Sequence, residues 1–171
     1  MATASKGLEA LFLDGLKDLF YAENKILKAL PKMAEGAYTE EVTAAFEKHL
    51  TETEEQVERL NSVFEILGEE AKGKECPAID GIIAEGEEIL EEYEGTPAID
   101  AGLVASAQAV EHYEIARYGT LVAWAGILGL DDAVELLQTT LDEETATDEA
   151  LTELADGGIN EAAFEQEEEE A

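Results

Sequence analysis

Apolar residues recur three or four positions apart along four long stretches of the chain, a spacing that places side chains on one face of an α-helix. The four stretches cover residues 8–34, 39–70, 97–125 and 131–155. Long helices with one apolar face bury those faces against one another. The pattern therefore predicts an all-α fold in which four long helices pack as an antiparallel bundle.

The connection between the second and third predicted helices, residues 71–98, is long and is not a plain loop. It contains the sequence GIIAEGEEILEEY, whose apolar residues predict a short extra helix. Pro77 and Pro97 mark two helix starts, because proline is favoured in the first turn. We expect a bundle formed by residues 1–156, followed by an acidic C-terminal tail, residues 157–171.

Each of the four apolar faces is interrupted near its middle by acidic or imidazole side chains. Apolar turns precede and follow every interruption. The interrupting residues are Glu23 in the first helix, His49 and Glu52 in the second, Glu111 and Glu114 in the third, and Glu144 and Asp148 in the fourth. In an antiparallel bundle these positions can meet at one level of the core.

Such a meeting of side chains predicts a metal site. An unpaired carboxylate is costly to bury, so it takes up a proton or finds a cation. Several carboxylates with one imidazole suit a hard or intermediate divalent metal. Carboxylates can also bridge two ions, and this much negative charge favours two cations over one.

Each interruption also has a simpler explanation when it is considered alone. Glu23 can pack its aliphatic stem at the core edge while its carboxylate stays in water. His49 can be a hydrogen-bonded core histidine, and Glu114 can pair with Arg117 three residues later. Basic residues are scarce, however, and Arg117 is the only one in the third and fourth helices. We therefore favour the metal site.

The charge of the chain is extreme, with 42 acidic and 10 basic residues and a net charge of −32. Nucleic acid and anionic membranes are excluded as expected partners, because both require a basic surface. So much like charge repels itself unless salt screens it, and in molar salt the Debye length falls to about 3 Å. The composition therefore predicts a salt-adapted protein from an extreme halophile.

The remaining composition favours a cytoplasmic protein. Cys76 is the only cysteine, which excludes an internal disulfide and a cysteine-based zinc site. No apolar run reaches membrane-spanning length, and the first residues do not resemble a secretion signal. We expect a cytoplasmic location.

Four segments of the chain resemble the YciE/YciF-like family of ferritin-like proteins, which are associated with stress and have no assigned reaction. The segments are LFYAENKILKALPKM (19–33), FEKHLTETEEQVERL (46–60), AQAVEHYEIARYGTL (107–121) and LLQTTLDEETATDEALTELA (136–155). The resemblance covers about residues 8–156, and the acidic composition suggests a haloarchaeal-type member. It implies a ferritin-like antiparallel four-helix bundle with one long crossover, a homodimer, and a dinuclear iron-type site. Manganese is the alternative metal.

The resemblance also implies roles for single residues. The wider ferritin-like pattern places single glutamates on two helices and Glu-x-x-His pairs on the other two. Glu23 then corresponds to the first single glutamate, and Glu111 or Glu114 to the second.

The other two helices depart from that pattern. The second helix offers His49-x-x-Glu52, in reversed order, and the last offers Glu144 and Asp148 without a histidine. The metal would therefore be held mainly by oxygen atoms. His112 lies about 100° around its helix from Glu111 and is expected outside the ligand set.

Two functional hypotheses follow. The first is a di-metal protein with redox activity that protects against oxidative stress, acting on a small substrate such as oxygen or peroxide. Tyr118, one turn after Glu114, is in that case a nearby hydrogen-bond donor or redox-active group, although a core tyrosine is the simpler interpretation. The alternative is a non-catalytic stress or interaction protein with a structural or vestigial metal site. An iron-storage cage is less favoured than either.

Overall fold

The computed structural model describes residues 7–170, and the side chains of residues 7–165. Its helices are α1 (Leu8–Gly36), α2 (Glu40–Leu67), α3 (Pro77–Glu92), α4 (Ala98–Leu128), α5 (Asp131–Leu154), a π-helical turn η1 (Ala155–Ile159), and α6 (Asn160–Glu170). Residues 7–170 contain no β-strand. The all-α prediction is confirmed. The ends of the predicted bundle and tail, residues 1–6 and 171, lie outside the described residues.

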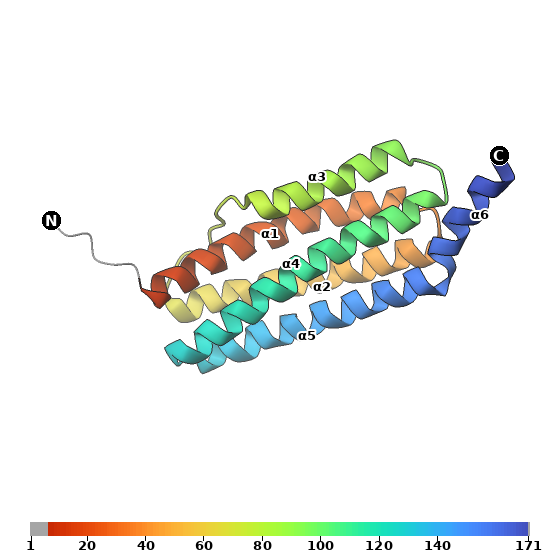
Figure 1. Ribbon diagram of the computed structural model, residues 1–171. Helices are drawn as coiled ribbons and strands as arrows, with labels where there is room; N and C mark the ends of the chain where they lie inside the picture. The colour runs from red at the N-terminus through yellow and green to blue at the C-terminus, as the bar shows by residue number, and fades with distance from the viewer. Residues whose placement is uncertain (1–6, 171) are drawn as a thin grey trace.

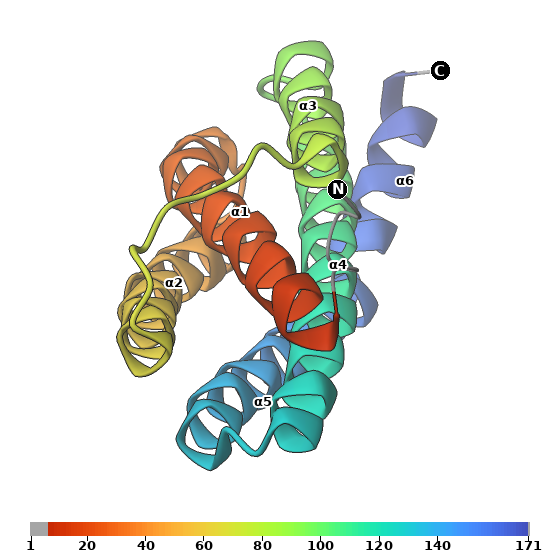
Figure 2. The same cartoon turned by 90° about the vertical axis from the view of Figure 1, so that its left-hand side faces the viewer.

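The four long helices α1, α2, α4 and α5 lie side by side along one axis (Figure 1). In contact order they form a ring in which α1 packs on α2, α2 on α5, α5 on α4, and α4 on α1. Each neighbouring pair in this ring runs antiparallel, while α2 and α4 run in the same direction (Figures 1 and 2).

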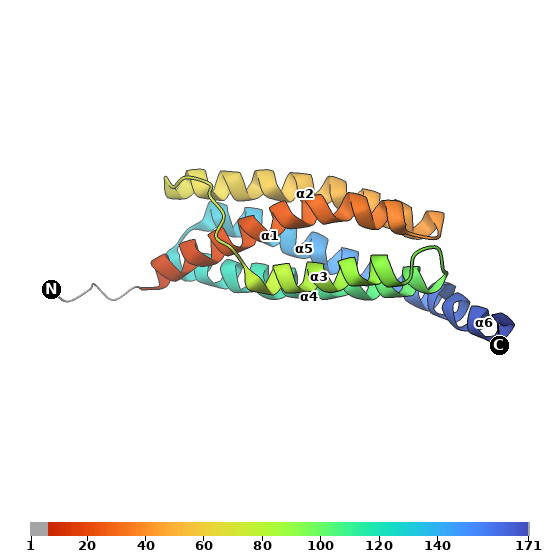
Figure 3. The ribbon, with the colours of Figure 1, turned by 90° about the horizontal axis from the view of Figure 1, so that it is seen from above.

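Helix α3 belongs to the crossover between α2 and α4 and covers the outside of the bundle. It packs on α4 and α1 (Figure 3). At the start of α3, the Tyr21 hydroxyl lies 3.0 Å from both carboxylate oxygens of Asp80 and donates one hydrogen bond shared between them. Lys25 forms a 3.0 Å ion pair with the same carboxylate. The predicted extra helix is therefore present and is anchored to α1.

The helix ends follow the local sequence. The Thr39 side chain caps α2 by accepting a hydrogen bond from the Val42 N–H. Gly68 and Gly129 end α2 and α4 with φ of 67° and 71°, a left-handed conformation that glycine adopts without steric cost. Pro77 occupies the first turn of α3, as its position in the sequence predicted.

Asp100, in the first turn of α4, ties that helix to the α1–α2 turn. Its carboxylate accepts hydrogen bonds from the Tyr38 N–H (2.7 Å), the Thr39 N–H (2.9 Å) and the Thr39 hydroxyl (2.6 Å). Asp100 is buried, and these three donors satisfy its charge. The contact joins the starts of α2 and α4 at one end of the bundle.

The buried apolar side chains form two clusters at different levels along the bundle. The first includes Ile26, Leu30, Phe46, Leu103 and Val104. The second includes Phe12, Leu16, Leu60, Leu121 and Leu137. Burying one such side chain contributes about 1.5–3 kcal/mol. The interrupted faces seen in the sequence thus become two apolar layers with a polar layer between them.

Most of the expected C-terminal tail is helical. Gly158 has φ 125° inside the π-helical turn, which changes the chain direction between α5 and α6 (Figure 1). Helix α6 contacts α4.

Among residues 7–170, no helix combines the length and the apolar character that crossing a lipid bilayer requires.

Candidate metal centre

Four buried side chains from three helices converge in the polar layer. They are His49 of α2, Glu111 and Glu114 of α4, and Glu144 of α5. Each offers one nitrogen or oxygen atom, and these four atoms all lie within 4.8 Å of one another. The cluster therefore has the size and the donor atoms of a metal site, as the interrupted apolar faces predicted.

The contacts inside the cluster leave most of its polar atoms unsatisfied. His49 Nδ1 lies 3.0 Å from Glu111 Oε1, and His49 Nε2 lies 3.9 Å from Glu144 Oε2. Apart from this imidazole, no described side chain outside the group of carboxyls donates a hydrogen bond to Glu111, Glu114 or Glu144, and Glu111 faces Glu144 while Glu114 faces Glu23. A buried carboxylate without donors is strongly destabilising unless it is protonated or bound to a cation.

Glu23 of α1 completes the layer from the fourth helix. Its side chain is fully buried, and one of its oxygens accepts a hydrogen bond from the Tyr118 hydroxyl. The other oxygen has no partner among the described residues. Glu23 is not one of the four tightly grouped donors, but the charge of its carboxylate raises the pKa values of Glu114 and Glu111. All four bundle helices therefore contribute a buried acidic or imidazole group.

Burial and mutual repulsion make these carboxylates hard to ionise. The pKa of Glu23 rises from 4.5 to about 8, first because burial removes water and second because the Glu144 carboxylate is near. Burial likewise raises the pKa of Glu111 from 4.5 to about 8. Burial, with the neighbouring carboxylates, raises the pKa values of Glu114 and Glu144 well above the usual range. Without a cation the cluster therefore holds protons at neutral pH.

Two predicted ligands, Glu52 and Asp148, do not belong to the tight group. Glu52 forms an ion pair with Lys48, while its second oxygen is buried without a described partner. Asp148 accepts a 3.4 Å hydrogen bond from Gln108 and lies 3.1 Å from His112 Nε2. The charges of both carboxylates raise the pKa of Glu111. Their assignment as metal ligands stays a prediction.

The contacts differ from the simpler explanations given above for Glu23 and Glu114. Arg117 does not pair with Glu114 but lies 3.9 Å from Asp18 and over the Tyr113 ring. Glu23 keeps none of its surface in water. His112 is exposed and contacts Asp148, outside the group of four, as its helix angle predicted.

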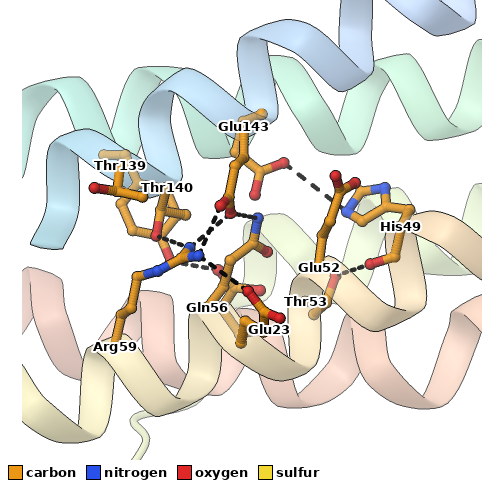
Figure 4. A network of polar contacts seen from close by, with 12 residues as sticks. Glu23, His49, Glu52, Thr53, Gln56, Arg59, Thr139, Thr140 and Glu143 are labelled. Atoms are coloured by element: carbon orange, nitrogen blue, oxygen red, sulfur yellow. Dashed lines mark hydrogen bonds and ion pairs between the residues drawn. The ribbon is translucent and has the colours of Figure 1, made fainter.

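A polar network beside the cluster was not predicted from the sequence. Arg59 of α2 holds both carboxylate oxygens of Glu143 on α5, each at 2.6 Å (Figure 4). The same guanidinium donates to Thr140 at 3.2 Å, and the Gln56 amide donates to Glu143 at 3.3 Å. Glu143 is adjacent in sequence to Glu144, so this network fixes α5 beside the cluster. The available signal was the polar residues Thr53 and Gln56 on the inward face of α2, followed by Arg59 one turn later.

The raised pKa values predict how the stability of the metal-free protein depends on pH. Between the unfolded pKa of 4.5 and the folded pKa of about 8, the folded protein holds protons that the unfolded chain has released. The free energy of unfolding should therefore fall as pH rises through this window, by about 1.4 kcal/mol per pH unit for each such group. Urea unfolding in molar salt with a chelator, at about pH 5 to about pH 8, measures the slope.

Glu111→Gln is the matched variant for this measurement, because it removes one raised carboxylate and keeps the side-chain shape. Its slope should be shallower than that of the wild type. Equal slopes for the two proteins would show that Glu111 is not protonated in the folded, metal-free state.

The chain was compared with protein families and with known proteins. Residues 7–164 match the family described as a domain of unknown function, DUF892. Protein YciF of Escherichia coli (strain K12) is 43% identical over 159 residues, which is 92% of this chain and 96% of the relative.

Solved structures give the same relationship. The crystal structure of the E. coli stress protein YciF has a TM-score of 0.87 at 43% identity and covers 91% of this chain and 98% of its own. YcfI from Rhodopseudomonas palustris, provisionally described as a structural protein, has a TM-score of 0.84 at 49% identity, with coverages of 89% and 97%. A protein from Xanthomonas campestris shares the fold at 20% identity and a TM-score of 0.74, with coverages of 95% and 99%.

Proposed function

This chain belongs to the DUF892 family, and from its buried cluster we propose that it is a ferritin-like, stress-associated protein that binds two metal ions, iron first and manganese as the alternative. The observation that carries the proposal is the convergence of His49 with the carboxyl groups of Glu111, Glu114 and Glu144, which are buried and face no positively charged side chain other than His49. A divalent cation supplies the missing positive charge. Oxygen-rich donors with one imidazole suit iron or manganese.

The arrangement of the helices supports the ferritin-like assignment. Helices α1 and α2 form one antiparallel pair, α4 and α5 form another, and the long crossover with α3 joins them. Ferritin-like di-metal proteins place inward-facing glutamates on all four bundle helices. Here Glu23, Glu111 and Glu144 are buried on three helices and His49 is buried on the fourth, with Glu52 near the edge of the same face.

When bound, two such metals supply electron transfer and an open coordination position for oxygen or peroxide. The residues of this chain have separate roles around them. Glu111, Glu114, Glu144 and His49 would hold the cations. Burial raises the pKa of Tyr118, so its hydroxyl stays protonated and continues to donate to Glu23. The Arg59–Glu143 pair keeps α2 and α5 in fixed positions beside the ligands.

A non-catalytic role is the second candidate. It is favoured by the provisional description of YcfI as a structural protein, at 49% identity. In that case metal would serve only to neutralise the buried carboxylates and hold the four helices together. The cluster would then add stability but no turnover.

Two further features remain proposals. We propose a homodimer, on the basis of the family resemblance. We also propose a halophilic protein, on the basis of the net charge of −32, and a cytoplasmic location, on the basis of the single cysteine.

Metal analysis of protein purified in molar salt tests the proposed function. We expect about two iron or manganese ions per chain, as in dinuclear sites. Absence of metal after anaerobic purification and incubation with Fe(II) or Mn(II) would contradict the proposal. If metal binds, consumption of oxygen or peroxide supports the redox role, whereas a higher melting temperature without turnover supports the structural one.

A further inference from the structure

An apolar pocket lies between α1, α3 and α4 and extends to the metal cluster. The space inside it that is open to a water-sized molecule is about 30 Å³. The side chains that line its walls are aliphatic and include Ile26 and Leu30 of α1, Ile82, Ile83 and Leu90 of α3, and Val110 of α4.

The few charged groups of the pocket are found at its two ends. His49 and Glu111 line it and are buried, with exposed fractions of 3% and 0%, so they form its inner end. Lys32 and Glu87 line it and are exposed, so they form its mouth. Both carboxylate oxygens of Glu111 are buried and face no described hydrogen-bond donor other than His49 and the Glu144 carboxyl. The pocket therefore joins solvent to the metal cluster through an aliphatic passage.

The charges indicate which ligand fits. Lys32 and Glu87 form a 2.9 Å ion pair, so neither charge is left over at the mouth for an ionic headgroup. The protein carries a net charge of −32, which repels an anionic ligand. A cationic headgroup would have to lose its hydration shell along the aliphatic walls. A neutral molecule meets none of these costs.

We propose that this pocket is a binding site for a small, uncharged aliphatic molecule whose inner end lies against His49 and Glu111. This inference rests on the proposed function in one respect, since that end would then lie beside the bound metal. The ligand class follows from the aliphatic walls, the neutral mouth and the position of the two buried cluster residues.

Helix α3 forms the outer wall of the pocket in a fixed position. A Cβ at Gly36 would lie 2.3 Å from Leu90 Cδ2, and one at Gly102 would lie 2.6 Å from Ile89 Cγ2. These close approaches hold the second half of α3 against α1 and α4. A Cβ at Gly86 would meet only Ser106, at an ordinary 3.6 Å. A larger side chain at Gly86 can therefore enter the pocket while α3 stays in position.

The first experiment uses the metal-free protein in molar KCl. We expect 1-hexanol to shift the methyl NMR signals of Ile26, Ile82 and Ile83, while hexanoate and hexylammonium bind at least about tenfold more weakly. Gly86→Leu should weaken hexanol binding at least about tenfold. Gly81→Leu is the matched control, because Gly81 lies on the same helix, is exposed, and has no atom within 4 Å of an added Cβ. It should bind hexanol as the wild type does.

A second blocking variant, Ser106→Leu, makes the same test from α4 and does not depend on changing α3. Absence of hexanol binding to the wild type would overturn the inference. Wild-type affinity in both blocking variants, or equal binding of hexanoate, would overturn it as well.

The second experiment places the ligand relative to the metal. In Mn(II)-loaded wild type and Gly81→Leu, the paramagnetic ion should broaden the proton signals of exchanging hexanol, and this broadening should be lost in Gly86→Leu. If hexanol binds the metal-free protein but Mn(II) does not bind at all, the proposed function fails and the pocket stands. If Mn(II) binds and the hexanol signals stay sharp, the inference fails and the metal site stands.

Discussion

Replacing Glu111 with glutamine is expected to lower the metal affinity of the protein at least about tenfold. Glu111 lies at the centre of the cluster, within 3.0 Å of His49 Nδ1 and with an exposed fraction of 0%. Glutamine keeps the shape of the side chain but removes the negative charge that the cation requires. Metal per chain, measured after dialysis against metal-free buffer in molar KCl, should fall sharply.

Glu55→Gln is the control for this loss. Glu55 is also a helical glutamate, but its side chain is 69% exposed and pairs with Arg59 at 3.4 Å on the outside of α2. Its metal content should equal that of the wild type. If Glu111→Gln binds metal as fully as Glu55→Gln does, the carboxylate site described here is wrong.

The same variant should have opposite effects on stability with and without metal. In the metal-free protein at neutral pH it removes a buried carboxyl group that must take up a proton when the chain folds, so it should be at least as stable as the wild type. In saturating metal the wild type gains stability from binding, about 4 kcal/mol at a metal concentration 1,000 times the dissociation constant. The melting temperatures of the two proteins should therefore cross as metal is added. Parallel curves would mean that Glu111 does not contribute to binding.

Lowering the salt concentration from molar KCl to about 10 mM is expected to unfold the bundle, because the Debye length then grows from about 3 Å to about 30 Å. Residues 75–171 contain 27 acidic residues and a single basic one, Arg117. Helices α3, α4, α5 and α6 therefore carry almost only negative charge. Their mutual repulsion opposes packing once it is no longer screened.

Circular dichroism at each dialysis step measures this loss. Returning the sample to molar KCl should restore the helical signal, which distinguishes charge repulsion from irreversible aggregation. A helical signal that stays constant down to about 10 mM salt would rule out charge repulsion as a limit on stability.

The fold was largely readable from the sequence, because helix periodicity and helix ends are local. The predicted range 8–34 became α1 (Leu8–Gly36), and the predicted range 39–70 begins at Thr39, which caps α2. Pro77 marks the start of α3. The crossover helix was predicted from the same kind of local pattern. The packing of α3 on α1 and α4 was not predicted, because it depends on contacts between distant segments.

The site was predictable only in part, for a related reason. A residue in the middle of an apolar face must point inward, and Glu23, Glu111 and Glu144 are indeed buried. Glu52 and Asp148 lie near the edge of such a face. There the helical turn of about 100° per residue does not specify whether a side chain points into the core or toward a partner at the surface. Their observed partners, Lys48 and His112, depend on side-chain directions that the sequence pattern does not specify.

The buried carboxylate of Asp100 sets the relative positions of His49 and Glu111 along the bundle axis. Helices α2 and α4 run in the same direction, and Asp100 holds their starts together at Thr39. His49 follows Thr39 by ten residues, and Glu111 follows Asp100 by eleven, so at 1.5 Å per residue they lie about 15 Å and about 16 Å from the shared starting point. The number of residues between Asp100 and Glu111 therefore matters as much as their identity. Inserting or deleting one residue there would move Glu111 by about 1.5 Å along the axis and turn it by about 100°, away from His49.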